Sequence, residues 1–467
     1  MRPVNLPDGF DLLDLHVAHP DRYPFLLETV SGGSVDHRAA DSTGDTWDLL
    51  FAFPGPTLQL DGSFRLAGPG SEGQADFLGA LDSWWRDTDP AHPPAGHLPF
   101  SGGWFLFLGY DLARQIEPLD PDTRTPNSGP IAFATRIPVA IVRNRRNQQA
   151  WIIAEDSHLD HISVVLDDLQ KLSDKNGLLA KSSHLPRSVS LVSELREPDS
   201  AIFLKAVAEV RRLIANGDVY QVNLSHRWQA TVRKEVSHAG IYHRLRQTNP
   251  APFAGLATRG DWSVISSSPE RLVRCRAGRV ETRPIAGTYP RAENSAEEDV
   301  LRRDLLANPK ERAEHIMLID LERNDLGRVC QPGTVTVDEF MVVESYAHVH
   351  HIVSNVCGQL RPGTTPGAVI RAVFPGGTIT GCPKVRCMEV IAALEPASRG
   401  PYTGSMGYLN LDGSMDLNIL IRSFVLEGRK LAFSAGGGIV ADSDPARELV
   451  ETHAKAKGLL MALGGKT

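Results

Sequence analysis

The chain has 467 residues, enough for a large core, and its 49 basic and 56 acidic residues give a net charge of −7. No block of like charge stands out, which argues against a protein that binds nucleic acid or a membrane surface. No apolar run is long enough for a transmembrane helix, and the start lacks a signal-peptide pattern, so we expect a cytoplasmic protein. The cysteines are scattered and form no CxxC pair, which argues against a disulfide framework and a zinc site; they are Cys275, Cys330, Cys357, Cys382 and Cys387.

Residues 1–170 are predicted to form an N-terminal segment of mixed α and β structure. Pro- and Gly-rich turns separate strand-like runs over 47–53, 103–107, 131–142 and 151–154. No catalytic motif occurs in this segment. The stretch from Phe25 to Val30 is predicted to be a strand end or a turn that packs into the core.

Composition changes to Lys, Ser, Asp, Asn and Pro over 171–198, which indicates a surface linker. The region that follows, 199–464, contains all the candidate chemistry. A helix is expected from Ser200 to Asn216, because apolar residues recur there at helical spacing and Gly217 ends the pattern.

The strand predicted after this helix, 219–225, has one polar face. Gln221, Asn223 and Ser225 alternate there with Val and Leu. This face either lines a site or belongs to a half-exposed sheet, and the pattern by itself favours the sheet.

A lone acid, Glu270, follows the turn at Ser268-Pro269, and a hairpin-like unit then runs through Gly278 to Thr288. A single glutamate beside a turn is weak evidence of function. A general acid does need a carboxyl on a rigid element, with its pKa raised by burial. Glu270 is therefore a candidate for that role.

Two stretches each place a pair of glutamates three residues apart, shortly after an Asn-Pro or Asp-Pro dipeptide. The pairs are Glu311 with Glu314 and Glu448 with Glu451. Asn308 and Asp444 are good N-caps with Pro at the first helical position, so each pair should share one helix face. Four carboxylates brought together need a cation, which suits Mg²⁺. The alternatives are a capping-box acid at Glu311 and a solvated helix face at Glu448.

Two glycine-rich loops, 374–384 and 435–439, match neither a Walker A loop nor the GxGxxG pattern. Glycines let backbone N–H groups approach a carboxylate closely, although tight turns between strands are the alternative. Arg422 and Tyr402 are further candidates, since an arginine fork matches a carboxylate at two points.

The order and spacing of these motifs resemble the chorismate-utilising enzymes, which include the anthranilate, aminodeoxychorismate, isochorismate and salicylate synthases. The resemblance is strong over 200–460 and weaker over 1–170. It rests on Ser268-Pro-Glu270-Arg, Arg283-Pro-Ile-Ala-Gly-Thr288, Glu311-Arg-Ala-Glu-His315, Arg323-Asn-Asp325, Thr378-Ile-Thr-Gly-Cys-Pro-Lys384 and Gly436-Gly-Gly-Ile-Val-Ala-Asp442. It implies an α/β (α+β) fold in which two large, mainly antiparallel sheets pack face to face with helices outside, and the N-terminal segment completes the core.

The resemblance also implies roles for the candidate residues. Glu314 and Glu451 are expected to bind Mg²⁺ directly, with Glu311 and Glu448 nearby or acting through water. Glu270 is expected to protonate the leaving 4-hydroxyl of chorismate. The remaining positions expected around the substrate are His351, Thr378, Tyr402, Arg422, Gly436, Gly437, Gly438 and Lys455. Chorismate is a dianion, so a chain of net negative charge needs the metal, the cations and the glycine amides to bind it.

Gln221 favours ammonia as the nucleophile, because relatives that add water carry a Lys base there and ammonia needs no base. Six stretches look like aminodeoxychorismate synthase, namely 219–225, 249–253, 348–351, 379–381, 416–420 and 436–438. Ala286 looks like anthranilate synthase, since many aminodeoxychorismate synthases have a Lys there that attacks C2 of the ring. We therefore expect a 4-amino-4-deoxychorismate product, for para-aminobenzoate and folate synthesis. Anthranilate synthase is the alternative, and the ordered acid and metal positions disfavour a non-catalytic anion-binding scaffold.

The resemblance also bears on partners and regulation. No cysteine lies in a nucleophile-elbow context, so a separate glutaminase subunit is expected to form a heterodimer with this chain and supply ammonia. In the family, Leu-Leu-Glu-Ser near the start helps to form a tryptophan pocket used in feedback. This chain has Leu26-Leu-Glu28-Thr29, which leaves tryptophan binding open.

Overall fold

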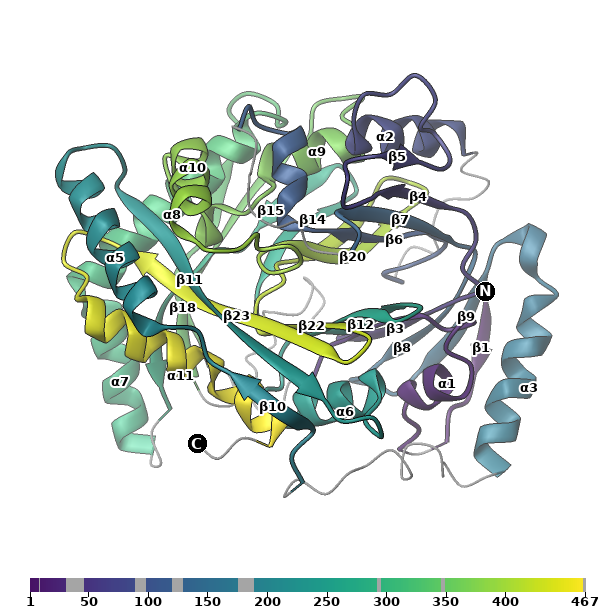
Figure 1. Cartoon of the computed structure of the whole chain (residues 1–467). Coiled ribbons are helices and arrows are strands. Elements are labelled where there is room, and N and C mark those ends of the chain that lie inside the picture. The colour runs from purple at the N-terminus through teal and green to yellow at the C-terminus, as the bar shows by residue number, and fades with distance from the viewer. Residues whose placement is uncertain are drawn as a thin grey trace.

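The computed structural model describes residues 1–7, 9–30, 46–88, 98–119, 129–174, 189–291, 295–345 and 349–464. These residues form two large antiparallel sheets with helices on their outer sides (Figure 1). The fold expected from the sequence is therefore confirmed. The larger sheet has 12 strands. Eleven of them follow the order β1 (Arg2–Val4), β9 (Ala150–Ala154), β8 (Val139–Asn144), β3 (Trp47–Ala52), β2 (Phe25–Glu28), β12 (Phe253–Arg259), β13 (Trp262–Ser268), β22 (Ser423–Glu427), β23 (Lys430–Ile439), β11 (Gln221–Val232) and β10 (Val192–Arg196). The short strand β19 (Gly381–Cys382) also pairs with β11.

The second sheet has 11 strands. Ten of them follow one order, and the eleventh, β17 (Thr336–Ser345), also pairs with β18. That order is β16 (Ile285–Pro290), β18 (Val349–Gln359), β15 (Arg279–Thr282), β14 (Arg271–Arg276), β21 (Met415–Asn418), β20 (Ser405–Asn410), β6 (Gly103–Leu108), β7 (Ala132–Ile137), β4 (Thr57–Leu60) and β5 (Leu66–Ala67). The β14–β15 hairpin predicted from the sequence is present. Its two-residue turn has positive φ at Ala277 and Gly278, as a type I′ hairpin turn requires.

The helices lie outside the two sheets. α1 (Leu13–Ala18), α3 (His161–Asp174), α6 (His238–Thr248) and α11 (Pro445–Leu463) pack on the larger sheet. α2 (Phe77–Asp87), α8 (Pro309–Gly327) and α9 (Pro366–Val373) pack on the smaller one. The others are α5 (Ser200–Ala215), α7 (Ser295–Ala307) and α10 (Lys384–Leu394), with short 3₁₀ turns η1 (Tyr110–Gln115), η2 (Asp156–His158) and η3 (Gly377–Ile379). No helix in the described ranges combines the length and the apolar character needed to cross a membrane.

A third core fills the space between the sheets. The rings of Phe25 on β2 and Phe105 on β6 stack with centroids 4.1 Å apart, and Phe133 and Trp262 pack around them. Each buried aromatic side chain removes a large apolar area from water, so this layer fixes the two sheets against each other.

The two regions distinguished in the sequence interleave in both sheets. β2 lies between β3, its neighbour in the chain, and β12, which comes more than 200 residues later. Of the predicted linker, residues 171–174 end α3 and 192–196 form β10, while 175–188 lie outside the described residues. The described ends of that segment therefore belong to regular elements.

Proline divides one predicted strand in two. The run 131–142 forms β7 and β8, which pair in different sheets, with Pro138 at the crossing. Proline has no N–H for the ladder, and the chain changes sheet at this residue.

The two helices that carry the glutamate pairs begin where the sequence predicts. Asn308 Oδ1 accepts from Lys310 N at 3.0 Å, and Asp444 Oδ1 accepts from Arg447 N at 2.9 Å. These caps satisfy free N–H groups of the first turn. α8 packs against β16 and β18, and α11 packs against β23. The two glutamate pairs therefore lie on helices that cover different sheets.

Candidate active site

The glycines of β23 lie between the acids of α11 and those of α8. A Cβ placed on Gly437 would lie 3.2 Å from Lys455 Nζ and 3.5 Å from Glu451 Oε1. A Cβ on Gly438 would overlap Gln221 Nε2 and lie 3.3 Å from Glu314 Oε1. The missing side chains leave the space in which the two helices present their acids.

The remaining two acids lie close by. Glu448 Oε2 is 3.7 Å from the Cβ position of Gly437, and Glu311 Oε2 is 3.0 Å from that of Gly287 on β16. Gln221 at the start of β11 donates to Glu314 Oε1 at 2.9 Å. On the polar face of the strand 219–225, Gln221 therefore reaches the glutamates, and the half-exposed sheet favoured by the pattern is wrong at Gln221 and Asn223, which are buried.

The four glutamates have too few neighbouring cations to balance their negative charge. Burial raises the pKa of Glu311, Glu314 and Glu448, and a neighbouring glutamate adds to each shift. Burial also acts to raise the pKa of Glu451, but Lys455 lowers it overall. Lys455 Nζ lies 2.6 Å from Glu451 Oε1 and donates to the carbonyl of Gly436 at 3.0 Å.

The donor chemistry of this group fits Mg²⁺, which prefers carboxylate oxygen and keeps positions open for substrate and water. Within the described ranges, no three acidic, His or Cys side chains are already close enough together to hold a metal ion. Glu311, Glu314, Glu448 and Glu451 are the residues that would hold it, and a cation there would offset the burial that raises the pKa of Glu311, Glu314 and Glu448.

Glu270 lies between β13 and β14 and is 5% exposed. Thr378 Oγ1 donates to Glu270 Oε1 at 2.7 Å, and the backbone N–H of Ile285 also donates to the carboxylate. Burial raises the pKa of Glu270 to about 7, against the opposing effects of these hydrogen bonds and of Lys455. A carboxylic acid with this pKa holds its proton for a substantial fraction of the time at neutral pH, as a general acid must.

The segment Ile285-Ala286-Gly287 connects Glu270 with His351. Ile285 N–H reaches the acid, and the carbonyl of Gly287 accepts from His351 Nδ1 at 3.1 Å. Burial lowers the pKa of His351 to about 4, so the ring is neutral. Ala286 is buried between these two contacts, which places position 286 within the site. His348 lies outside the described residues.

The candidate anion-binding groups include Arg422, which contacts the backbone of Lys455. Arg422 has a positive φ and donates to the carbonyl of Lys455. Burial lowers the pKa of Arg422 to about 10, which leaves the guanidinium charged at neutral pH. Tyr402 and Glu451 lie close enough to interact electrostatically with Arg422, so Tyr402, Arg422, Lys455 and the glycine strand form one neighbourhood.

The comparisons with known proteins agree with this geometry. The family model described as chorismate binding enzyme matches residues 58–461. The chain belongs to this family. It is 41% identical to an anthranilate synthase component I-like protein of Synechocystis over 86% of this chain and 81% of that protein. It is 40% identical to aminodeoxychorismate synthase component 1 of Bacillus subtilis over 84% of this chain and 83% of that protein.

Solved structures of chorismate-utilising enzymes share the fold. Anthranilate synthase component I from Streptococcus pneumoniae superposes with a TM-score of 0.75 at 31% identity, covering 89% of this chain and 92% of that chain. The isochorismate synthase MenF from Escherichia coli superposes with a TM-score of 0.72 at 21% identity, covering 99% and 93%. The second likeness concerns the fold alone.

One acidic residue of this chorismate binding enzyme was missed by the sequence analysis. Glu322 on α8 is buried, and its pKa is raised by burial and by Asp325. Glu322 Oε1 lies 3.2 Å from the Cβ position of Gly377, next to Thr378, which binds Glu270. Helical spacing was the available signal, because 311, 314, 315, 318, 322 and 325 fall on one face of α8.

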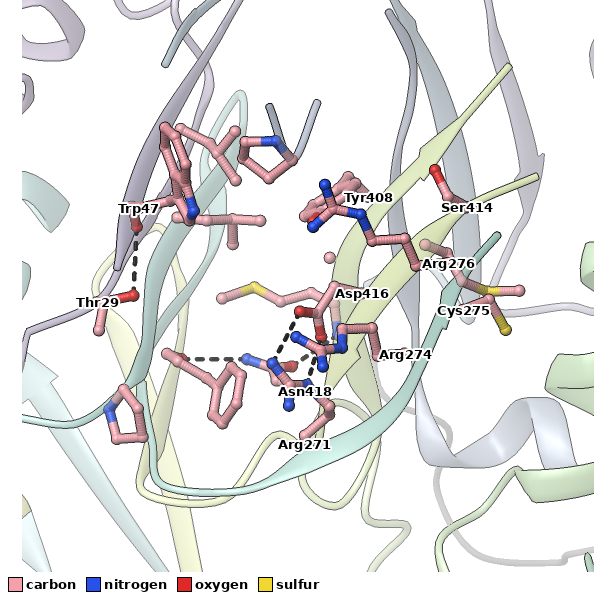
Figure 2. A pocket seen from close by; sticks show the side chains of 18 of the residues that line it. Thr29, Trp47, Arg271, Arg274, Cys275, Arg276, Tyr408, Ser414, Asp416 and Asn418 are labelled. Carbon is pink, nitrogen blue, oxygen red and sulfur yellow. Dashed lines mark hydrogen bonds and ion pairs between the residues drawn. The ribbon is translucent and has the colours of Figure 1, made fainter. Parts of the chain in front are cut away.

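A separate cavity of about 160 Å³ lies between the sheets and is lined by Leu27, Glu28 and Thr29, from the stretch where a tryptophan pocket was considered (Figure 2). Thr29 donates to the carbonyl of Trp47 on one wall, and Arg271 binds Asp416 on the other. A cavity of about 150 Å³ holds one benzene-sized ring. The volume therefore suits one small ring, and tryptophan binding, which the sequence leaves open, stays open.

Proposed function

We propose that this chain catalyses the Mg²⁺-dependent amination of chorismate to 4-amino-4-deoxychorismate, for para-aminobenzoate and folate synthesis. The observation that carries the proposal is Glu270. Its buried carboxyl has a pKa of about 7 and is held by Thr378 and Ile285 beside the glutamate group. A leaving hydroxyl needs such a proton donor, and two of the relatives are named aminodeoxychorismate synthase component 1.

Each group has a role in this reaction. Arg422, Lys455 and the N–H groups of the glycine strand bind the substrate carboxylates, and Tyr402 borders the ring. The glutamates would hold Mg²⁺, which would supply positive charge for a substrate carboxylate and for negative charge that develops as the hydroxyl leaves. Glu270 donates its proton to that hydroxyl, which departs as water. His351 borders the substrate as a neutral ring, so it contributes a contact and no positive charge.

Gln221 supports ammonia as the nucleophile. Its amide donates to Glu314 and cannot take a proton from water, whereas unprotonated ammonia needs no base. Because position 286 is alanine, no covalent adduct forms there. Ammonia reaches C4 directly, or after a small nucleophile from solvent has added at C2.

Ammonia is proposed to come from a separate glutaminase subunit, in a cytoplasmic heterodimer with this chain. The word "component" in the names of the relatives supports a partner for those proteins. The purified chain is expected to use ammonium salts and to leave glutamine untouched. Turnover of glutamine by the chain alone would contradict this part.

Anthranilate synthase is the second candidate, and Ala286 favours it. The buried alanine offers no amine beside Glu270, and relatives named anthranilate synthase component 1 reach 39% identity. The mass and absorption spectrum of the product from chorismate, Mg²⁺ and ammonium salt decide between the two. A 4-amino-4-deoxychorismate product is expected, and anthranilate as the only product would overturn the assignment.

A further inference from the structure

Two buried amide oxygens on the polar face of β11 lack hydrogen-bond partners among the described residues. Gln221 is 3% exposed and Asn223 is 9% exposed, and the unpaired atoms are Gln221 Oε1 and Asn223 Oδ1. Most buried polar atoms in proteins are hydrogen-bonded, so two exceptions on one face of a strand need an explanation.

The hydrogen bonds of the amide nitrogens fix the orientation of both side chains. Gln221 Nε2 donates to the Glu314 carboxylate at 2.9 Å, and Asn223 Nδ2 donates to the Thr378 carbonyl at 3.5 Å. Carboxylates and carbonyls only accept, so neither amide can be turned over without losing its bond. The two oxygens are therefore acceptors that no described group uses.

The two amide oxygens lie between the proposed metal site and the proposed general acid. Residues i and i+2 of a strand point to the same face, with roughly 6.6 Å between their Cα atoms. Gln221 contacts Glu314 of the metal group, while Asn223 contacts Thr378, which donates to the general acid Glu270. A small molecule between the two oxygens is thus beside both the metal group and the acid.

We propose that Gln221 Oε1 and Asn223 Oδ1 form the ammonia subsite of this enzyme. The inference rests on the proposed function, and its new element is Asn223. Ammonia has three N–H donors and one lone pair. With two N–H groups on the two strand oxygens, its lone pair can point away from β11 toward the substrate.

The same two oxygens discriminate against water as a nucleophile. Water must lose a proton as it attacks, and an amide oxygen is too weak a base to take one. Ammonia attacks through its lone pair first and gives up its surplus proton afterwards to solvent. A pair of neutral acceptors thus orients ammonia and does not activate water.

The test compares Asn223→Leu, which keeps the bulk and removes the amide, with the unmodified chain. Losing one hydrogen bond to ammonia should raise KM for ammonium about fivefold to tenfold, at saturating chorismate and Mg²⁺. KM for chorismate should stay within about twofold, since the chorismate contacts are unchanged. Asn223→Ala is measured in parallel in case the leucine variant does not fold.

Ser225→Ala is the matched control, because Ser225 lies on the same face but is already bonded to Glu395 at 2.8 Å. Both KM values are expected to stay unchanged in this control. If the Asn223 variants raise both KM values equally, or lower kcat alone, the subsite is overturned while the proposed function stands. If the unmodified chain gives no amino product with ammonium, the proposed function fails and the subsite fails with it.

Discussion

Two groups of buried carboxylates in this chain are balanced in different ways. Near the N-terminus, Glu28 accepts hydrogen bonds from Arg145 and Arg246, each at 2.9 Å, and from Tyr242 at 2.7 Å. Asp48 beside it accepts from Arg143 and Arg145. In the glutamate group of α8 and α11, the described residues contain one ion pair, between Lys455 and Glu451.

The difference separates a structural cluster from a site. Arginine forks can satisfy a buried carboxylate from several directions, and such a cluster holds strands and helices in place. Buried carboxylates that raise one another's pKa cost stability, unless a ligand supplies the missing positive charge. The sequence contains glutamates in both places, and only their partners distinguish the two roles.

The largest expected effect is on Glu270→Gln. This change removes the transferable proton and keeps the shape, so kcat should fall about 10²- to 10⁴-fold. In the unmodified enzyme, the acid must be protonated, and kcat should therefore fall as pH rises through about 7. Steady-state kinetics across pH 5–9 measure both effects. Glu389→Gln, at an exposed glutamate paired with Arg386, is the control and should leave kcat unchanged.

Next comes Arg246→Met in the N-terminal cluster. Removing one partner of a buried ion pair costs about 3–5 kcal/mol, and Arg246 serves both Glu28 and Asp11. Urea unfolding should show this loss, while kcat per folded molecule stays unchanged. Arg212→Met breaks an exposed pair with Glu209 and should leave the free energy of unfolding nearly unchanged. Equal losses in the two variants would contradict the structural role.

The third expectation concerns Glu314→Gln and Glu451→Gln. Loss of a metal partner typically costs about 10- to 100-fold in affinity or activity, so each variant should lose at least that. Mg²⁺ should also raise the melting temperature of the unmodified chain and should raise that of the variants less. Full turnover in excess EDTA would remove the basis for a metal site.

The pH dependence of this Mg²⁺ effect follows from the raised pKa values. Glu311, Glu314 and Glu448 stay protonated to a higher pH in the folded chain than in the unfolded one, whose glutamates ionise near pH 4.5. Stability is therefore lost as pH rises above that value. Mg²⁺ binds the ionised form, so its stabilisation should be larger at pH 8 than at pH 5. A larger effect at pH 5 would contradict the assignment.

The smallest expected effect is partial formation of a covalent adduct in Ala286→Lys. The new amine would lie in the segment between Glu270 and His351, and it can attack C2 of chorismate if burial keeps it neutral. Intact-protein mass spectrometry with chorismate and no ammonia should then find a covalent adduct on part of the protein. No adduct on the unmodified chain is the control, and an adduct there would place the nucleophile elsewhere.

Sequence signals within one helix, such as caps and residue spacing, predicted the parts of the site that depend on that helix alone. The caps at Asn308 and Asp444 and the i, i+3 spacing predicted both helices and the common face of each pair. The helix after residue 199 ends at Ala215 with Asn216 as its C-cap, as expected. These features depend on neighbours within about one turn, so the sequence contains them.

Contacts across the fold were not visible in the sequence. Glu270 is hydrogen-bonded by Thr378 and Ile285, and Glu322 lies beside Gly377, and these neighbours are distant from the acids in the sequence. The strand β10 was read as linker because the stretch 171–198 around it is rich in Lys, Ser, Asp, Asn and Pro, although its backbone pairs with β11. Polar composition indicates exposure, and an edge strand can be as exposed as a linker.

The pairing of β11 with β23 has a consequence for how the chain is made. Leu224 pairs with Gly437, so β11 leaves the ribosome long before its partner strand is synthesised. Until then this edge is open to other chains, and domains with such distant pairings fold slowly. The last helix brings Glu448 and Glu451, so a truncated chain lacks half of the glutamate group. Activity therefore requires synthesis of α11, which follows both β11 and β23 in the chain.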